Sequence, residues 1–126
     1  MKVLLINGSP RQNGNTATAL AEIAKQLTQE GIDSEIVWIG NKPIRGCIAC
    51  GQCKIKGIGR CVFDDDICNK ISEKFEGSNA LIVGSPVYYG QPNGALLSII
   101  QRAFYSNGSN ISGKSAASIA VCRRGG

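Results

Sequence analysis

Short runs rich in apolar residues recur along the chain and predict the strands of a parallel sheet, of which the first and the third are expected to be buried. They are shorter than the ten or more residues that a helix usually needs, and polar or glycine-containing stretches separate them. The predicted strands are residues 2–6, 34–39, 80–85 and 115–121.

Between these runs, apolar positions recur at helical spacing. Residues 16–30 carry a stripe of apolar or small side chains, and the predicted helix stops at Gly31. Acidic residues 64–66 are expected to open a second helix, because carboxylates stabilise the positive N-terminal end of a helix. The buried face of this second helix carries Ile67, Ile71 and Phe75.

A third helix is expected to begin at Pro92, where the missing N–H is not needed, and to run to about Tyr105. Residues 106–113 are expected to form a polar loop. Strands and helices alternate throughout, which predicts an α/β fold with a doubly wound parallel sheet. We expect one domain, residues 1–126. Such a sheet normally continues beyond its fourth strand, so we expect the domain to be truncated at its C-terminus and to lack its last strand.

Composition and the N-terminus bear on the compartment. Apolar residues make up 43% of the chain, but no stretch approaches the roughly 20 apolar residues that span a bilayer. The first apolar run is too short for a signal peptide and leads into a glycine turn. We therefore expect a cytoplasmic protein, in which thiols stay reduced and clustered cysteines serve metals or redox chemistry.

Four of the 6 cysteines lie in a long loop, residues 40–63, with the spacing C-x2-C-x2-C-x7-C. Four thiolates in such a run hold iron–sulfur clusters or zinc, and a disulfide framework is disfavoured in a reducing compartment. The absence of histidine excludes a mixed cysteine–histidine zinc site and a histidine general base. Cys68 is a rival fourth ligand, although a buried structural cysteine is the better interpretation. The four cysteines of the run are Cys47, Cys50, Cys53 and Cys61.

The formal net charge of +5 is concentrated beside the cysteines. A nucleic-acid interface needs a broad basic face with interleaved aromatic side chains, and no aromatic residue interleaves this patch. We therefore expect neither a nucleic acid nor a membrane as a partner. The charges either form a solvated surface, or they offset an anionic cluster and steer an acidic electron-transfer partner. The basic residues are Lys42, Arg45, Lys54, Lys56 and Arg60.

The loop between the first strand and the first helix, residues 8–16, is suited to bind a phosphate. Backbone N–H groups and the helix dipole attract anions there, and polar side chains add hydrogen-bond donors. The loop lacks both G-x-G-x-x-G and the Walker lysine, so dinucleotide and NTP sites are disfavoured. The alternative is a plain turn in which Asn15 or Thr16 merely caps the helix. The candidate donors are Ser9, Arg11, Asn13, Asn15 and Thr16.

Two further segments leave strands at the same carboxyl edge, where open α/β sheets bind ligands. Residues 85–92 follow the third strand, and their aromatic side chains suit a planar ring, although Pro, Gly and Tyr are also ordinary loop residues. Residues 123–126 follow the fourth strand and either reach the polar edge of such a ring or form a frayed terminus. A phosphate site beside a flat-ring site indicates FMN. The cysteine loop, which leaves the second strand, is expected to face this flavin.

The motifs GSPR-x2-GNT, C-x2-C-x2-C, SPVYYG and RRGG together resemble the flavodoxin-like NAD(P)H-dependent FMN reductase superfamily. Within it, the cysteine run is similar to that of the iron–sulfur flavoprotein family, and the resemblance covers essentially the whole chain. It implies a flavodoxin-like sheet with strand order 2-1-3-4-5. It also implies FMN phosphate ligands, namely Ser9, Arg11, Asn13, Asn15 and Thr16.

The resemblance further implies the remaining ligands of both cofactors. A [4Fe–4S] cluster would be held by Cys47, Cys50, Cys53 and Cys61, of which Cys61 follows an unusually long gap. The isoalloxazine would be contacted by Pro86, Val87, Tyr88, Tyr89, Gly90, Arg124 and Gly125.

The function that this resemblance implies is that of an FMN-dependent oxidoreductase. Electrons would pass between the cluster and FMN to a small-molecule acceptor, from a ferredoxin-like or NAD(P)H donor. Members of the family work as homodimers or homotetramers, with the cluster near a flavin across an interface. No catalytic acid or base is expected, because the cofactors carry the chemistry.

Two alternatives remain open. In the first, the protein is a cluster-free NAD(P)H-dependent FMN or quinone reductase whose cysteines are free thiols, a redox pair or a zinc site. In the second, it is a four-cysteine zinc interaction module, which would leave the phosphate loop and the loop after the third strand without a purpose.

Overall fold

The computed structural model describes residues 1–124, which form an α/β fold around a parallel sheet. The sheet contains β1 (Lys2–Asn7), β2 (Asp33–Trp38), β3 (Ala80–Tyr88) and β5 (Ser115–Val121). These strands lie in the order β2-β1-β3-β5, all parallel, which confirms the predicted fold class and the order of the four predicted strands. A short strand, β4 (Gln91–Pro92), pairs antiparallel with the end of β3.

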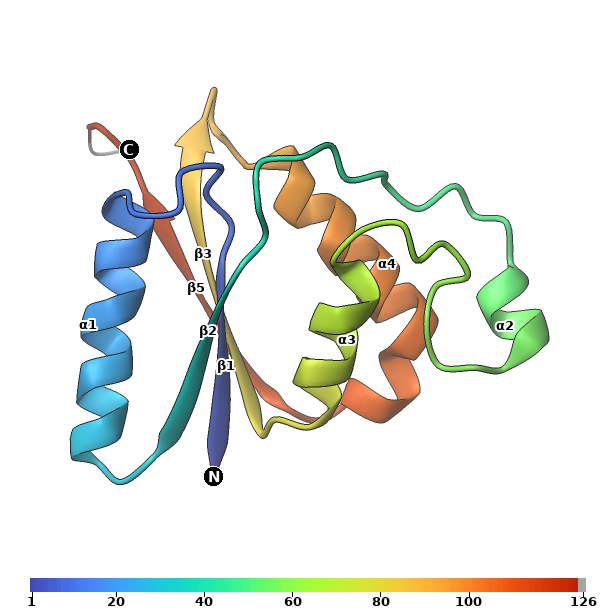
Figure 1. Ribbon diagram of the computed structural model, residues 1–126, viewed down its shortest axis with the longest axis horizontal. Helices are drawn as coiled ribbons and strands as arrows, with labels where there is room; N and C mark the ends of the chain where they lie inside the picture. The colour runs from blue at the N-terminus through green and yellow to red at the C-terminus, as the bar shows by residue number, and fades with distance from the viewer. Residues whose placement is uncertain (125–126) are drawn as a thin grey trace.

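Helices cover both faces of the sheet (Figure 1). Helix α1 (Asn15–Gln29) lies on one face, and α3 (Cys68–Glu76) and α4 (Gly94–Ile111) lie together on the other. A short helix, α2 (Gln52–Lys56), lies on the outer side of α4, away from the sheet. Within residues 1–124, no helix combines the length and the apolar character needed to cross a membrane.

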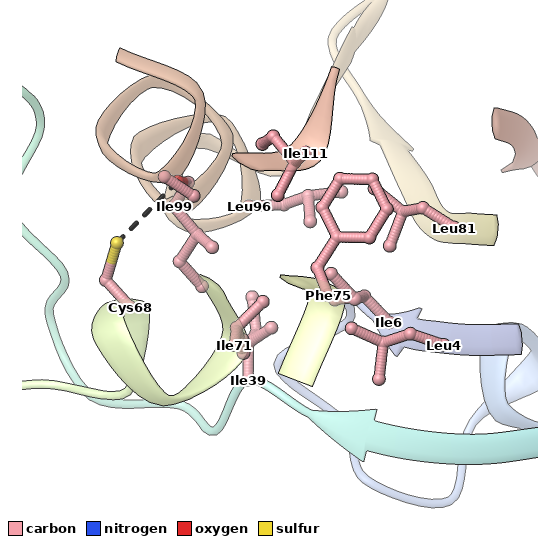
Figure 2. Packing of buried hydrophobic residues seen from close by; sticks show 11 residues of the cluster. Leu4, Ile6, Ile39, Cys68, Ile71, Phe75, Leu81, Leu96, Ile99 and Ile111 are labelled. Carbon is pink, nitrogen blue, oxygen red and sulfur yellow. Dashed lines mark hydrogen bonds between the residues drawn. The ribbon is translucent and has the colours of Figure 1, made fainter. Parts of the chain in front are cut away.

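The central strand β1 contributes to a separate core on each face of the sheet, because alternate side chains of a strand point in opposite directions. Val3 and Leu5 pack with Leu20 beneath α1. Leu4 and Ile6 belong to the larger core beneath α3 and α4 (Figure 2). This alternation explains why the predicted strand reads as an unbroken apolar run.

The second predicted helix begins later than expected. Helix α3 starts at Cys68, so the prediction that residues 64–66 open it is wrong in its bounds. Asp66 nevertheless caps the helix, since its Oδ1 accepts a hydrogen bond from the Cys68 N–H at 2.9 Å. Its other oxygen, Oδ2, pairs with the guanidinium of Arg102. A short carboxylate side chain is well suited to cap from outside the helix in this way.

The predicted start of the third helix at Pro92 is also wrong. Pro92 pairs with Val87 in the β3–β4 hairpin, a short edge pairing that tolerates a residue without an N–H. Helix α4 begins at Gly94, and Asn93 is its N-cap, with Oδ1 accepting from the Ala95 N–H at 3.2 Å.

The end of this helix lies at Ile111 rather than near Tyr105, so residues 106–111 are helical and not a polar loop. The polar side chains of this last part have buried partners. Asn107 Nδ2 donates to Ser72 Oγ at 3.2 Å, and Ser106 Oγ donates to the Arg102 carbonyl at 2.7 Å. The tertiary bond from Asn107 to α3, together with the bond from Ser106 to the preceding turn of α4, thus offsets the weak helix propensity of Ser and Asn.

Two glycines lie where neighbouring segments approach closely, Gly8 beside α4 and Gly84 beside α1. The Gly8 N–H donates to the Gly84 carbonyl at 2.8 Å. A Cβ atom at Gly84 would lie 2.9 Å from Thr16 Cγ2 and 3.1 Å from Leu20 Cδ1. Both neighbours are buried side chains of α1, so neither is free to move away.

We therefore expect Gly84→Ala to lower the free energy of unfolding by about 1–3 kcal/mol, the usual range for overpacking a core. Urea denaturation measures this change. Gly108→Ala is the matched control, because a Cβ there meets nothing within 4 Å and Gly108 lies inside α4. That control should gain about 0.5–1 kcal/mol from helix propensity. Equal stability of the two variants would contradict the packing argument.

Candidate functional site

The loop between β1 and α1 lies at the carboxyl edge of the sheet and is held by side chains that the sequence did not single out. Asn7 is 1% exposed, and its Oδ1 accepts from the Ser9 N–H while its Nδ2 donates to the Gln12 carbonyl, both at 3.1 Å. Trp38, at the end of β2, donates its Nε1–H to the Ser9 carbonyl at 2.8 Å. A polar residue that closes an apolar strand is the signal that could have identified Asn7.

The N-terminus of α1 presents donors and no negative charge. Its N-cap is Gly14, and within residues 1–124 no side chain accepts from its first N–H groups and no acidic residue lies in its first turn. The alternative in which Asn15 or Thr16 caps the helix is therefore wrong. Ser9 and Thr16 are buried at this loop, with exposed Arg11, Asn13 and Asn15 around them. Uncapped N–H groups, hydroxyls and a guanidinium together fit the phosphate of FMN.

The hairpin formed by the end of β3 and β4 is tied to the same loop. Asn93 Nδ2 donates to the Gly8 carbonyl at 2.7 Å, and the Asn93 N–H donates to Ser85 Oγ at 2.9 Å. The structure thus brings together two segments that the sequence predicted to share a ligand. Asn93 was missed, because the sequence shows it only as one more polar residue of a turn.

The residues predicted to line a flavin ring lie at the end of β3 and in the turn of this hairpin. Pro86 and Val87 are half-buried in β3, and Tyr88 and Gly90 are exposed. Tyr89 is fully exposed and has a left-handed backbone with φ of 51°. A bulky residue rarely adopts this conformation, and such strain is concentrated at functional sites.

The last predicted flavin ligands follow β5. Val121, the final residue of β5, pairs with Pro86 of the hairpin, and Arg124 is exposed just beyond it. Arg124 therefore leaves the sheet at the edge that carries the hairpin. Gly125 lies outside the described residues.

All four cysteines of the run line one small cavity beside α4. Its volume of about 20 Å³ is close to that of a single water site. Cys53 is buried, Cys61 is half-buried, and Cys47 and Cys50 are exposed. In the described part of the chain, no three Cys, Asp, Glu or His side chains lie close enough together to hold a metal ion. The structure thus gathers the four thiols around one space without placing them at coordination distance.

Interactions with α4 and within the loop hold this cysteine loop in place. Lys54 of α2 places its Nζ over the ring of Tyr105 at 5.2 Å, and Arg45 lies over the ring of Phe63 at 4.5 Å. Helix α2 itself is bounded by Gly51 and Gly57, whose φ values of 69° and 59° suit glycine. The loop therefore folds as a compact unit against α4.

The position of the cavity differs from the expected one. It is lined by Arg102 and Tyr105, which lie beyond the first two turns of α4 and so roughly 12 Å or more from the hairpin end of that helix. Figure 1 shows α2 on the side of α4 that is remote from the β1–α1 loop. Within one chain, the cysteines therefore do not face the predicted flavin site.

The chemistry of the cavity fits a sulfur-ligated cluster. Its lining offers four thiols, and among residues 1–124 no carboxylate contributes to it. The cation Arg102 also lines it and suits an anionic group. Four sulfur donors with a cationic neighbour are compatible with an iron–sulfur cluster, and four-cysteine zinc has the same ligand set.

Cys68 does not line this cavity and belongs to the core, as expected for a structural cysteine. It is 0% exposed, and its thiol donates to the Ile99 carbonyl at 3.7 Å (Figure 2). Burial raises the pKa of the Cys68 thiol to about 11. The other remaining cysteine, Cys122, is exposed just after β5.

We expect Cys68 to resist alkylation by iodoacetamide at pH 8 in the folded apoprotein, because the thiolate is the reactive form and burial disfavours it. Cys47, Cys50 and Cys122 are exposed and should react. Peptide mass mapping measures the extent of modification at each site, and unfolding in guanidinium should render all six thiols reactive. Modification of Cys68 as fast as Cys122 in the folded protein would contradict its burial.

Comparison with known proteins identifies the family of this chain. The family described as NADPH-dependent FMN reductase matches residues 1–126. An iron–sulfur flavoprotein of Methanocaldococcus jannaschii is 36% identical over 103 residues, which are 82% of this chain and 52% of the relative. An iron–sulfur flavoprotein of Archaeoglobus fulgidus is 37% identical over 122 residues, 96% of this chain and 54% of the relative. The chain thus spans about half the length of these curated relatives.

Among solved structures, the fold is similar to that of RosB with bound 8-demethyl-8-formylriboflavin-5'-phosphate. The TM-score is 0.77 at 18% sequence identity, and the match covers 100% of this chain and 54% of RosB. At this identity the likeness shows the flavodoxin-like fold. Together with the family match, it leads to the conclusion that the chain belongs to the NADPH-dependent FMN reductase family and has iron–sulfur flavoproteins among its relatives.

Proposed function

We propose that this protein is an FMN-dependent oxidoreductase of the iron–sulfur flavoprotein type. The observation that carries the proposal is that the four cysteines, spread over residues 47–61, line one cavity that is lined also by a buried cation. In that cavity Cys47, Cys50, Cys53 and Cys61 would ligate a [4Fe–4S] cluster.

The FMN would be bound at the carboxyl edge of the sheet. Ser9, Thr16 and the uncapped N–H groups of α1 would bind its phosphate, assisted by Arg11, Asn13 and Asn15. The ring would lie against the hairpin, with Arg124 and Gly125 at its polar edge. When bound, FMN supplies one- and two-electron chemistry and the cluster supplies single-electron transfer. The residues of this chain bind and orient the cofactors, and none is assigned the role of an acid or base. The ring ligands of the hairpin would be Pro86, Val87, Tyr88, Tyr89 and Gly90.

The separation of the two sites within one chain supports a role for a second subunit. Because the cysteine cavity lies beside α4 and the phosphate loop lies at the sheet edge, a homodimer or homotetramer would bring one chain's cluster toward another chain's flavin. The electron donor would be NAD(P)H or a ferredoxin-like protein, and the acceptor a small molecule. A cytoplasmic location is part of this proposal, since it keeps the cysteine ligands reduced.

Cofactor analysis of protein purified without oxygen tests the proposal. We expect FMN together with about four irons and about four acid-labile sulfides per chain, the content of one cubane cluster. Zinc without flavin would overturn the assignment in favour of an interaction module. Iron without flavin would show that the β1–α1 loop does not bind FMN.

A second candidate is a cluster-free NAD(P)H-dependent FMN or quinone reductase. It is favoured by the observation that, in residues 1–124, the four thiols are not already grouped at metal-binding distance. In that case the purified protein would contain flavin and no iron, and it would oxidise NAD(P)H with a quinone or free flavin at a rate unaffected by removal of the cysteines.

A further inference from the structure

Arg102 is the most unusual buried residue of the molecule. It lies in α4 with 1% of its surface exposed, and it lines the cavity that the four cysteines share. Its guanidinium Nη atoms have partners, but within the described residues its buried Nε–H has no acceptor. A buried donor left without an acceptor destabilises the folded state, so such a group in a native site indicates a missing partner.

The two Nη groups of Arg102 join the beginning and the end of the cysteine loop. Nη1 donates to the Arg45 carbonyl at 3.3 Å, two residues before Cys47, and Nη2 donates to the Phe63 carbonyl at 2.8 Å, two residues after Cys61. Nη1 also pairs with Asp66 at the start of α3. One side chain therefore connects both ends of the segment that carries all four thiols.

The charge of this side chain is permanent and directed. A guanidinium stays protonated in proteins, and the ion pair with Asp66 offsets part of the cost of burying this charge. Asp66, the counter-ion, lines a different pocket, beside Trp38 and Ile67. Of the Arg102–Asp66 ion pair, the positive partner thus lines the cysteine cavity, and the negative partner lines the other pocket.

We infer that Arg102 positions the cysteine loop around the cluster and raises the cluster's reduction potential through its buried charge and its free Nε–H. This inference rests on the proposed function. An electron that enters the site makes four thiolates and a [4Fe–4S] core more negative by one charge, from −2 to −3 in total. A cation held in a site of low dielectric stabilises that reduced state more than the oxidised one.

The test is a reductive titration with dithionite, monitored by electron paramagnetic resonance, of anaerobically purified protein. In Arg102→Gln, the reduced-to-oxidised ratio at a given potential should fall at least tenfold, which is 59 mV for one electron. Asp66→Asn should shift the potential upward, because it removes the counter-ion and leaves the cation. Arg102→Lys should shift it downward less than Arg102→Gln, since lysine keeps the charge but has no Nε–H.

Lys70→Gln is the matched control, because it also removes one positive charge but from an exposed site on α3 that does not line the cavity. Solvent screening should keep its shift well below that of Arg102→Gln. A merely structural role for Arg102 would lower iron content without shifts of opposite sign in the Arg102 and Asp66 variants. If Arg102→Gln fails to retain iron, Asp66→Asn alone decides, and an unchanged or lowered potential there overturns the inference.

The outcomes separate this inference from the proposed function. Wild-type protein without iron would overturn the proposed function, and the inference with it. Wild-type protein with a full cluster, together with an unchanged potential in a cluster-containing Arg102→Gln variant, would overturn the inference alone.

Discussion

Replacing Cys53 with alanine is expected to yield a folded protein that binds FMN and contains no iron–sulfur cluster. Cys53 is the most buried thiol of the run, at 8% exposed, and it lies on α2 with its side chain in the shared cavity. A cubane cluster needs four ligands, and the alanine leaves the site with three, while no carboxylate among the described residues lines the cavity to replace the missing thiol. Iron, sulfide and flavin assays on the anaerobically purified variant measure the result.

FMN should be retained because α2 lies on the outer side of α4, remote from the β1–α1 loop (Figure 1). Cys122→Ala is the control: it removes an exposed thiol that does not line the cavity, and it should keep both cofactors. Loss of FMN together with the iron in Cys53→Ala would mean that the two sites are not independent. Full iron content in that variant would show that Cys53 is not a ligand.

Replacing Asn15 with aspartate is expected to weaken FMN binding about 100-fold while it stabilises the apoprotein. Asn15 is the first residue of α1, whose N-terminus has no side-chain cap in residues 1–124. A carboxylate there interacts favourably with the helix dipole, by about 0.3–1 kcal/mol. The same carboxylate repels a phosphate, and two unit charges roughly 5 Å apart interact by about 3 kcal/mol at an effective dielectric constant near 20.

Quenching of flavin fluorescence measures the dissociation constant, and urea denaturation of the apoprotein measures its stability. Riboflavin, which has no phosphate, serves as the control ligand and should bind the variant as it binds wild type. Gln29→Glu introduces the same charge at the far end of α1, roughly 20 Å away and beyond the screening length, so its FMN affinity should be unchanged. Equal losses for FMN and riboflavin in Asn15→Asp would place the phosphate elsewhere.

The central strand β1 could be predicted from the sequence because it is buried on both faces of the sheet. Its apolar residues are consecutive and do not alternate with polar ones, as is typical of such a strand. The predicted strand therefore ends within one residue of the observed one. The bounds of helices and strands were predicted less well where contacts with other parts of the chain determine them. Helix α4 extends to Ile111 because Ser106 and Asn107 find buried acceptors, and Pro92 is in a strand because Val87 happens to lie opposite. Ser72, the partner of Asn107, is 35 residues away in the sequence, so local helix propensity could not reveal it.

Residue types and their spacing determined the functional hypothesis before the fold was known. A glycine- and hydroxyl-rich turn after a buried strand predicts a phosphate site, and four thiols within a short loop predict a site for a sulfur-ligated metal or cluster. The tertiary structure decided where these groups lie relative to one another. In the structure, Asn93 links the phosphate loop to the hairpin. The cysteine cavity lies beside α4 and not at the edge of the sheet, where the sequence had placed it.

The role of Arg102 could be recognised only from the tertiary structure. In the sequence it is one basic residue among 14, inside a helix that reads as ordinary. Its burial and its bonds to both ends of the cysteine loop arise from packing between segments more than 35 residues apart, and among residues 1–124 its Nε–H has no acceptor. Long-range packing decides which charged side chains are buried. At a buried site of low dielectric, the electrostatic interactions of a polar group are stronger than in water, and the local sequence does not reveal which groups are buried in this way.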